Sequence, residues 1–569
     1  MARSLPQLLN GERAVVLAYV IQILSFTPLA LLPEAGSLSF VSLFALFVEI
    51  SADSGSNPLA RSFRTRPGVP SGILLGAVTL PGLLFSRLIQ ILRAHTANGI
   101  GIEELEYLKL QYWATSASCL IVLIFLSTFC QRQGKSSNSI CSLSNSIPMH
   151  YVICAVLFVG LGLVSLSGQK YNGFSMAFIL MWMLIHGLAA VTLFQKILHM
   201  FPACASIGES LLVTLGLAIY FGDMVAYTAT KISYLETFMV PLLRYGIKRS
   251  EISTIIQGMV FGLLVLPWFY KNVLRMWEYF ASFRNGEMGN REIRNSIIFH
   301  TLLTFMLILV VPSWMQFVHA FHVHPIIWVF DFVLSEPLNR LTICIYWLVV
   351  IYASVGRFYK LSKNNKTTRI LLRKYYHLMA VSMFVPALIF QPKFLDLAFG
   401  AALAVFLLLE IIRIWKIRPL GHIIHQFMNA FTDHRDSDLL IVSHFSLLLG
   451  CAIPIWLSSG FTDRPLAPFA GILSLGIGDT MASMVGHKYG VLRWSKTGKK
   501  TIEGTAAGIT SVLAACFLLL PLLAATGYIF TTQWLSLIMA VTTSGLLEAY
   551  TAQLDNAFIP LIFYSLLCL

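Results

Sequence analysis

Residues 471–508 read GILSLGIGDTMASMVGHKYGVLRWSKTGKKTIEGTAAG, and they join an apolar run to a basic, glycine-rich segment. The apolar run ends at Gly478-Asp479, so a carboxylate stands where a membrane-spanning helix is expected to end. A carboxylate at such a place is costly unless it is paired or bound to a ligand, and it therefore indicates a functional site. The basic side chains and glycines that follow are typical of segments that bind phosphate groups. The stretch thus predicts a nucleotide site at the edge of a membrane.

The composition places this stretch in a polytopic membrane protein. The 569 residues are 57% hydrophobic and 12% charged, whereas soluble chains carry about 25% charged residues. Lys and Arg outnumber Asp and Glu by 40 to 26, an excess that in membrane proteins marks cytoplasmic loops. No basic stripe lies on a soluble domain, so nucleic acid is not an expected partner. The nine cysteines show no spacing typical of zinc sites or of a disulfide framework.

Apolar runs long enough to cross a bilayer recur along the whole chain. Their number predicts an all-α, polytopic integral membrane protein with about 15–17 transmembrane helices and a nucleotide site on the cytoplasmic face. The sequence divides into an N-terminal multi-spanning region, residues 1–355, and a C-terminal membrane-embedded domain, residues 356–569. Weaker apolar pieces at 231–243 and 325–335 are spans, re-entrant segments or surface helices. The expected spans lie near residues 13–33, 38–52, 70–92, 112–130, 150–168, 174–198, 208–228, 254–272, 296–318, 339–356, 376–392, 397–414, 439–458, 467–486, 509–527, 533–548 and 557–569.

The loops of the C-terminal domain alternate in charge. The basic loops are 357–374, 413–435 and 487–500, with seven, four and five Lys and Arg residues. The opposite loops carry only Lys393 and Arg464. The positive-inside rule therefore makes the basic loops cytoplasmic. Counting spans onward returns the junction 548–556 to the same side, so Glu548 and Asp555 are expected beside Asp479.

The nucleotide-binding hypothesis rests on one helix face and the basic segment after it. On a helix, Asp479, Ala482, Ser483, Gly486 and Gly490 share a small, polar face that phosphate could approach. The segment is not a P-loop, because it lacks the required glycine and lysine spacing. The alternatives are that Asp479 pairs with a lysine and that the basic segment only sets topology. The predicted nucleotide-binding residues are Gly486, His487, Lys488, Gly490, Arg493, Lys496, Gly498, Lys499, Lys500 and Glu503.

Two further segments carry polar groups that could take part in chemistry. Glu548 and Asp555 are seven residues apart, which on one helix places them on the same face, about 10 Å apart. Two such carboxylates could hold a divalent ion, although a solvated helix end is the alternative. After Pro419, apolar residues recur at helical spacing, so the segment that contains His422 is expected to be an interfacial helix. His377 stands at the mouth of another span, where a structural role is more common.

Three blocks of the C-terminal domain resemble the membrane enzymes that use cytidine nucleotides, namely the dolichol, phytol and farnesol kinases and, more distantly, phosphatidate cytidylyltransferase. They are GDTMASMVGHKYG at 478–490, KTGKKTIEGT at 496–505 and LLEAYTAQLDNAFIPL at 546–561. Further blocks narrow the resemblance to the dolichol kinase family, namely RKYYHLMAV at 373–381, IRPLGH at 417–422 and DHRDSDLLIVSHFSLLLGCAIPIWL at 433–457. Residues 1–355 resemble this family mainly in being multi-spanning.

The resemblance implies transfer of the terminal phosphate of CTP to the hydroxyl group of dolichol, giving dolichyl phosphate and CDP. It also implies a multi-pass protein of the endoplasmic reticulum whose active site faces the cytoplasm and whose product serves N-glycosylation and other dolichol-dependent glycosylation. Phosphoryl transfer needs a metal ion, cations on the phosphates and an in-line acceptor hydroxyl. The expected ligands are therefore CTP, dolichol or a related polyprenol, and Mg²⁺ or Ca²⁺.

The resemblance also suggests roles for single residues. Asp479, Glu548 and Asp555 are the expected metal ligands. The proton acceptor for the dolichol hydroxyl group is Asp479, Asp436 or His422, and the sequence does not decide among them. The basic residues expected on the triphosphate are Lys488, Arg493, Lys496, Lys499 and Lys500.

Three other functions compete with this one. A membrane cytidylyltransferase would use the same kind of site but release pyrophosphate and make a CDP-lipid. A kinase for another polyprenol, such as farnesol or phytol, is disfavoured only by the large N-terminal region. A transporter would need polar groups near the membrane midplane, whereas here they cluster at one membrane face.

Overall fold

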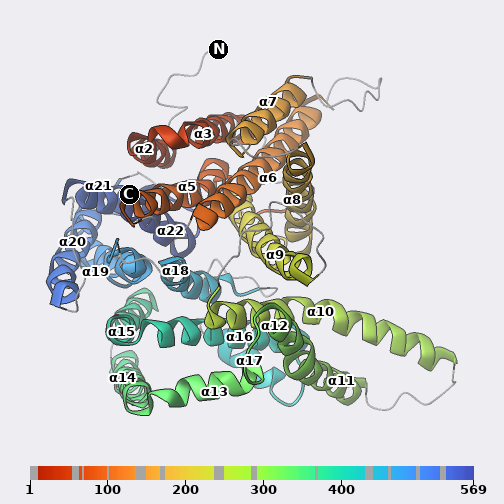
Figure 1. Ribbon diagram of the computed structural model, residues 1–569. Helices are drawn as coiled ribbons and strands as arrows, with labels where there is room; N and C mark the ends of the chain where they lie inside the picture. Colours follow the sequence, from red (N-terminus) through yellow and green to blue (C-terminus); the bar gives the residue numbers. More distant parts are fainter. Residues whose placement is uncertain are drawn as a thin grey trace. The chain divides into compact units, whose positions relative to one another are not determined.

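The computed structural model describes thirteen stretches of the chain, and their regular structure is helical (Figure 1). Within these stretches there is no strand, and an isolated antiparallel bridge pairs Arg493 with Thr501. The predicted all-α class is therefore confirmed. The described residues are 10–53, 63–66, 69–98, 102–135, 149–166, 173–235, 249–283, 291–364, 369–429, 440–458, 463–494, 500–525 and 534–569.

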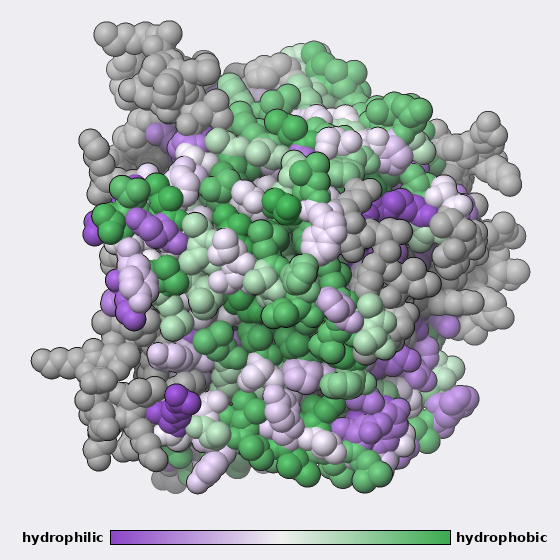
Figure 2. All heavy atoms as spheres, turned by 90° about the vertical axis from the view of Figure 1, so that its left-hand side faces the viewer, coloured by the Kyte–Doolittle hydropathy of each residue, from purple (hydrophilic) through white to green (hydrophobic). Residues whose placement is uncertain are grey.

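The helices have the length and surface of a multi-pass membrane protein. Ten of the described helices are long and apolar enough to cross a membrane, and five more apolar helices have 10–17 residues. The segment Pro337–Arg357 of α14 shows why lipid is needed, because only 6% of its most apolar window is buried. Figure 2 shows a face on which hydrophobic residues predominate. Such a surface is stable against hydrocarbon, where helices satisfy their own backbone hydrogen bonds.

The chain forms two compact units. The first comprises Met1–Ile247, Thr367–Val381 and Ile453–Leu569, and the second comprises Lys248–Lys366 and Ser382–Ala452. These units divide the chain differently from the predicted boundary between residues 355 and 356, because Ile453–Leu569 packs with the first 247 residues. The functional division at that boundary stays a prediction.

The first unit is built around α5, Ile73–Asn98. In its most apolar window α5 is 89% buried, and it contacts α2, α3, α6, α9 and α22 (Figure 1). The helices of this unit are α2 (Gly11–Ser25), α3 (Leu32–Asp53), α5, α6 (Ile102–Lys135), α7 (Met149–Leu166), α8 (Gly173–Met200), α9 (Ile207–Leu235), α19 (Asp479–Tyr489), α20 (Ile502–Ala525), α21 (Trp534–Tyr550) and α22 (Asp555–Leu567), with short helical segments η1 (Leu29–Leu31), η4 (Ala467–Phe469) and η5 (Ile472–Gly478).

The second unit packs α10 against α16. Its core includes Leu266, Phe299 and Ile412, which are buried together. Two helices, α15 (Arg369–Phe390) and α18 (Val442–Ser458), contribute a part to each unit. The other elements of the second unit are α10 (Glu251–Phe283), α11 (Arg291–Phe305), η3 (Met306–Val310), α12 (Val311–Val318), α13 (Pro325–Ser335), α14 (Pro337–Asn364), α16 (Pro392–Trp415) and α17 (Gly421–Asn429).

Two predictions about single elements need correction or completion. The first predicted span, residues 13–33, is interrupted: α2 ends at Ser25, and the chain resumes through η1 into α3. The break contains Pro28, which has no backbone N–H to donate to a continuing helix. Of the two weak apolar pieces, 325–335 is the helix α13, and 231–243 is described only to Leu235, where α9 ends.

Candidate functional site

Asp479 is the first residue of α19 and follows the π-helical segment η5 directly. Its side chain is buried, with the residue 6% exposed. π-Helical turns are rare and occur frequently at functional sites. A buried carboxylate requires a partner or a ligand. The role of Asp479 as the centre of the site stays a prediction.

The partner of Asp479 comes from α15. Lys374 Nζ donates to Asp479 Oδ2 in a buried ion pair. His377 lies one helical turn further along α15, with its Nδ1 atom 3.5 Å from the same oxygen. On a helix, residues three apart lie on one face, so both side chains reach Asp479 together. The lysine pairing that the sequence offered as the alternative for Asp479 does occur in the structure.

A glycine allows α15 to come this close. An ideal Cβ atom on Gly476 would lie 2.2 Å from the Cγ2 atom of Val381 in α15. No side chain fits in that space, so the residue one turn before Asp479 has to be glycine. The contact fixes α15 against η5 and thereby holds Lys374 within reach of Asp479.

The small face of α19 packs against α20. An ideal Cβ atom on Gly504 would lie 2.6 Å from the carbonyl oxygen of Ala482 and 3.0 Å from Cα of Gly486. Gly490 has φ −71° and ψ 121°, a conformation open to any residue. Small residues let membrane helices approach closely, so the structure gives Gly486 and Gly504 a packing role. Their predicted contact with nucleotide stays a prediction.

The basic segment begins and ends in a paired stretch. Ile502 N donates to the Leu492 carbonyl oxygen at 2.8 Å, and Trp494 N donates to the Lys500 carbonyl oxygen at 3.3 Å. Residues 495–499 lie outside the described residues, and the predicted ligands Lys496, Gly498 and Lys499 lie there. The described cations of the segment that are exposed are Lys488 and Arg493, and the His487 side chain is exposed beside them. Exposed cations at and beyond the end of the helix that begins at the buried Asp479 suit the binding of a polyanion at the surface.

Glu503 anchors this segment to the first turn of α20. Both of its carboxylate oxygens accept from Leu492 N, at 3.0 and 3.2 Å. In addition, Trp494 Nε1 donates to Thr505 Oγ1 at 2.9 Å. The described contacts of Glu503 therefore hold the backbone from which the basic side chains project, and its predicted nucleotide contact is not tested.

The end of α21 lies against the same segment. Lys500 Nζ donates to the backbone carbonyl oxygen of Glu548, and the rings of Trp494 and Tyr550 are 5.1 Å apart between centroids. The half-buried Glu548 side chain lies within electrostatic range of Asp479, Asp555, Lys374 and Lys500. Three segments far apart in the sequence, around residues 374, 479 and 548, therefore meet at one place.

One geometric prediction for the carboxylates was wrong. Glu548 and Asp555 do not share one helix face, because α21 ends at Tyr550 and α22 begins at Asp555. In the turn between them, Thr551 N still donates to the Leu547 carbonyl oxygen, and the amides of residues 552–554 donate to side chains. The seven-residue spacing suggested one helix, but it could not show where the hydrogen bonds of the connecting residues go.

The metal hypothesis was tested against the side chains of the described residues. Carboxylates are the right type of donor for Mg²⁺ and Ca²⁺. In the described part of the chain, no three His, Cys, Asp or Glu side chains gather closely enough to hold a metal ion. Mg²⁺ is usually bound by one or two carboxylates together with water and substrate phosphates, and the carboxylates here fit that mode only. The metal role of Asp479, Glu548 and Asp555 stays a prediction.

The remaining candidates lie elsewhere. Asp436 is outside the described residues. His422 is exposed at the start of α17, a helix of the second unit that the apolar spacing after Pro419 had predicted. Sequence reasoning missed Lys374 as a member of the site. The sequence did contain a pattern that could have identified Lys374. Lys374 and His377 are three residues apart, which puts a cation and an imidazole on one face of a span.

The family comparisons agree with the motifs. The family model for dolichol kinase matches residues 179–493. The chain is 56% identical to dolichol kinase EVAN of Arabidopsis thaliana, with full coverage of both chains. It is 30% identical to human dolichol kinase over 65% of this chain and 66% of the human protein, and 36% identical to dolichol kinase sec59 of Schizosaccharomyces pombe over 42% and 50%. No solved structure matches. The chain is therefore a member of the dolichol kinase family.

Proposed function

We propose that the protein phosphorylates dolichol with CTP as the phosphate donor. Family membership supports the reaction class and the acceptor. The observation that carries the site assignment is the buried Lys374–Asp479 pair, which lies at the start of the helix that leads into the exposed cations Lys488 and Arg493. A buried charge pair joined by one short helix to exposed cations is an arrangement suited to an anionic substrate and a positioned reaction centre.

The proposed step is a direct phosphoryl transfer. The hydroxyl oxygen of dolichol bonds to the terminal phosphorus of CTP, and the bond from that phosphorus to the bridging oxygen breaks. CDP leaves with the bond electrons, and the hydroxyl proton passes to a base of the protein or to water. Such a reaction depends mainly on positioning and on stabilisation of charge.

The basic segment is proposed to bind the triphosphate. Lys488, Arg493 and Lys500 are its described cations, and Lys496 and Lys499 complete the set. Lys500 is held by the carbonyl oxygen of Glu548, which would keep its charge near the carboxylates. When bound, Mg²⁺ or Ca²⁺ would neutralise charge on the phosphates, and Asp479, Glu548 and Asp555 would hold it.

The protein is also proposed to act at the endoplasmic reticulum, with this site on the cytoplasmic side. The support is the charge asymmetry of the predicted C-terminal loops, since the three basic loops carry sixteen Lys and Arg residues and the loops predicted on the opposite side carry two. CTP is a cytoplasmic nucleotide, and dolichyl phosphate made there would supply dolichol-dependent glycosylation.

A membrane assay with γ-³²P-labelled CTP, dolichol and Mg²⁺ tests this proposal, with labelled ATP as the control donor. The expected result is label in dolichyl phosphate with CTP and not with ATP. Released pyrophosphate and a CDP-lipid would instead assign a cytidylyltransferase. Label that enters farnesol or phytol in preference to dolichol would overturn the proposed acceptor.

A further inference from the structure

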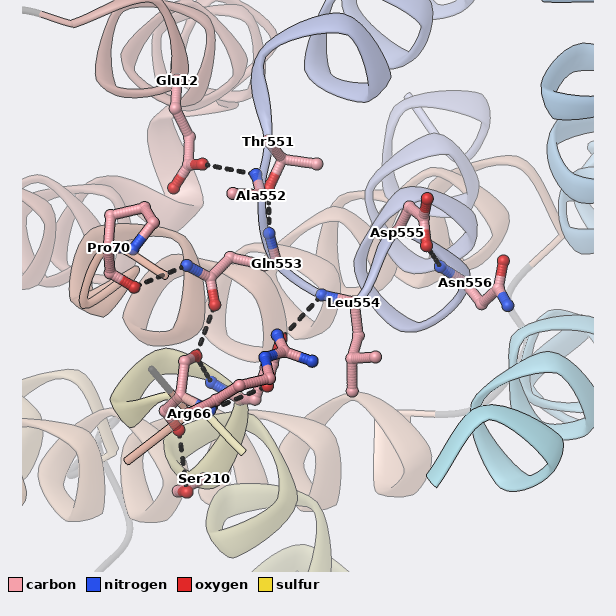
Figure 3. A network of polar contacts seen from close by, with 12 residues as sticks. Glu12, Arg66, Pro70, Ser210, Thr551, Ala552, Gln553, Leu554, Asp555 and Asn556 are labelled. Atoms are coloured by element: carbon pink, nitrogen blue, oxygen red, sulfur yellow. Dashed lines mark hydrogen bonds and ion pairs between the residues drawn. The ribbon is translucent and has the colours of Figure 1, made fainter. Parts of the chain in front are cut away.

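The turn that joins α21 to α22, residues 551–554, is held by the N-terminal part of the chain (Figure 3). Glu12 at the start of α2 accepts from Ala552 N at 3.4 Å. Glu209 in the first turn of α9 accepts from Leu554 N at 2.8 Å. Between them, Gln553 N donates to the Thr551 hydroxyl oxygen at 3.1 Å. Helix ends leave backbone groups that need partners, and here residues several hundred positions away supply two of them.

Glu209 is the most connected of these partners. Its Oε2 atom accepts from Ser206 N at 2.8 Å, and Ser206 Oγ accepts from Glu209 N at 3.1 Å. This is a capping box, which starts α9 and fixes the Glu209 side chain. The Oε1 atom accepts both from Arg66 and from Leu554 N. The residue is only 2% exposed, so a rigid, charged acceptor is held against the turn.

The side chain of Gln553 provides a second attachment. It is fully buried, its Nε2 atom donates to the Pro70 carbonyl oxygen at 3.0 Å, and its Oε1 atom accepts from Ser206 Oγ. Gly72, next to this contact, has φ +62°, and a Cβ atom there would lie 2.5 Å from the Gln553 amide. The surroundings thus fit Gln553 closely, and they belong to the same two N-terminal segments that hold Glu209.

The turn lies between the two carboxylates of the candidate site. Glu548 is in the last turn of α21, and Asp555 is the first residue of α22. The carbonyl oxygen of Glu548 also holds Lys500. Because the turn joins the end of α21 directly to the start of α22, a shift of the turn would move both carboxylates and the Lys500 contact.

We propose that Glu209, paired with Arg66, is a positioning residue for phosphoryl transfer. It fixes the turn at residues 551–554 through the hydrogen bond to Leu554 N, and it thereby orients Glu548 and Asp555 toward the basic segment. The N-terminal part of the chain thus contributes to catalysis through this turn. The inference rests on the proposed function, because the orientation of the two carboxylates matters only if they serve the reaction.

A matched pair of variants separates the effect of losing the hydrogen bond to Leu554 N from the effect of burying an unpaired charge. In both, Arg66→Met removes the cation, so that no unpaired charge is buried when Glu209 is changed. The first pairs it with Glu209→Gln, whose single amide oxygen can still accept from Leu554 N, while Ser206 N loses its side-chain acceptor in both variants. The second pairs it with Glu209→Ala, which removes the acceptor. Leu215→Ala, a buried position of α9 that lies further along the helix, is the control for destabilisation alone.

Two measurements are made on each purified protein. Hydrogen exchange followed by mass spectrometry reports protection of peptides that cover residues 549–556. Kinetic assays with CTP and dolichol give kcat and KM per folded molecule, with the folded fraction taken from size-exclusion chromatography. The alanine variant is expected to lose protection of this turn and to lose about 10–100-fold in kcat with little change in KM for dolichol. The glutamine variant is expected to keep both.

Three results would overturn the positioning role. They are a protected turn in the alanine variant, equal kcat values in the two Glu209 variants, and an equal fall in kcat for Leu215→Ala. If the unmodified protein transfers no phosphate from CTP to dolichol, the proposed function fails. Hydrogen exchange would then still decide whether Glu209 fixes the turn.

Discussion

The buried Lys374–Asp479 pair and the exposed cations of the basic segment hold charge in opposite ways. Lys374 and Asp479 lie 105 residues apart in sequence and meet only because α15 packs on η5. Lys488 and Arg493 are exposed, and their positions follow from the local chain. A buried pair is expensive to break, because the remaining charge is left without water, whereas an exposed cation can be exchanged at little cost in stability. We therefore expect folding and chemistry to depend on the first region, and nucleotide affinity on the second.

The largest effect is expected at Asp479. Asp479→Asn alone should lower the amount of folded protein, because Lys374 is left buried without a counter-charge. The double variant Asp479→Asn with Lys374→Met should restore folding while activity stays at least about 100-fold below the unmodified protein. Activity per folded molecule is measured with labelled CTP. Full activity in a folded double variant would show that Asp479 is only structural.

The second largest effect is expected when Lys499 and Lys500 are neutralised together. The apparent KM for CTP should rise about 10-fold or more, since a charge-assisted hydrogen bond contributes about 1.5–3 kcal/mol. The KM for dolichol and the thermal stability should change little. Lys393→Gln, a cation predicted on the other side of the membrane, is the matched control. An equal rise in that variant would mean that the basic segment has no special role.

Gly504→Ala tests the close packing of α20 on α19. The added Cβ atom would lie 2.6 Å from the Ala482 carbonyl oxygen. The two helices would have to move apart to avoid this clash, and the lost packing should destabilise the protein by about 1–3 kcal/mol. Gly160→Ala in α7 is the control, because no atom lies within 4 Å of its added Cβ. Thermal unfolding in detergent compares them. Similar midpoints for the two variants would contradict the packing role of Gly504.

The smallest effect is expected from salt. Raising ionic strength from 0.05 to 0.5 M should increase the apparent KM for CTP several-fold, because exposed charges are screened over about 10 Å or less. The Lys488→Gln, Arg493→Gln double variant should have a higher KM and a weaker salt dependence. If salt instead changed the thermal stability steeply and left the KM for CTP constant, the exposed cations would contribute to stability and not to nucleotide affinity.

The sequence by itself determined the membrane class, the helical fold, most spans and the family motifs, and it selected Asp479 as a candidate site residue. These follow from hydropathy, helical periodicity and residue spacing, which are local properties of the chain. The positions of the exposed residues Lys488 and Arg493 likewise follow from the local sequence.

Only the tertiary structure decided which groups meet. It paired Lys374 with Asp479, used Gly504 for helix packing, and ended α21 before Asp555. In the turn after α21, Leu554 N donates to Glu209, which lies 345 residues earlier. Local pattern cannot reveal such a partner, because a backbone amide is satisfied equally well by the next helical turn or by a distant carboxylate, and only the packing of α9 makes the second choice available.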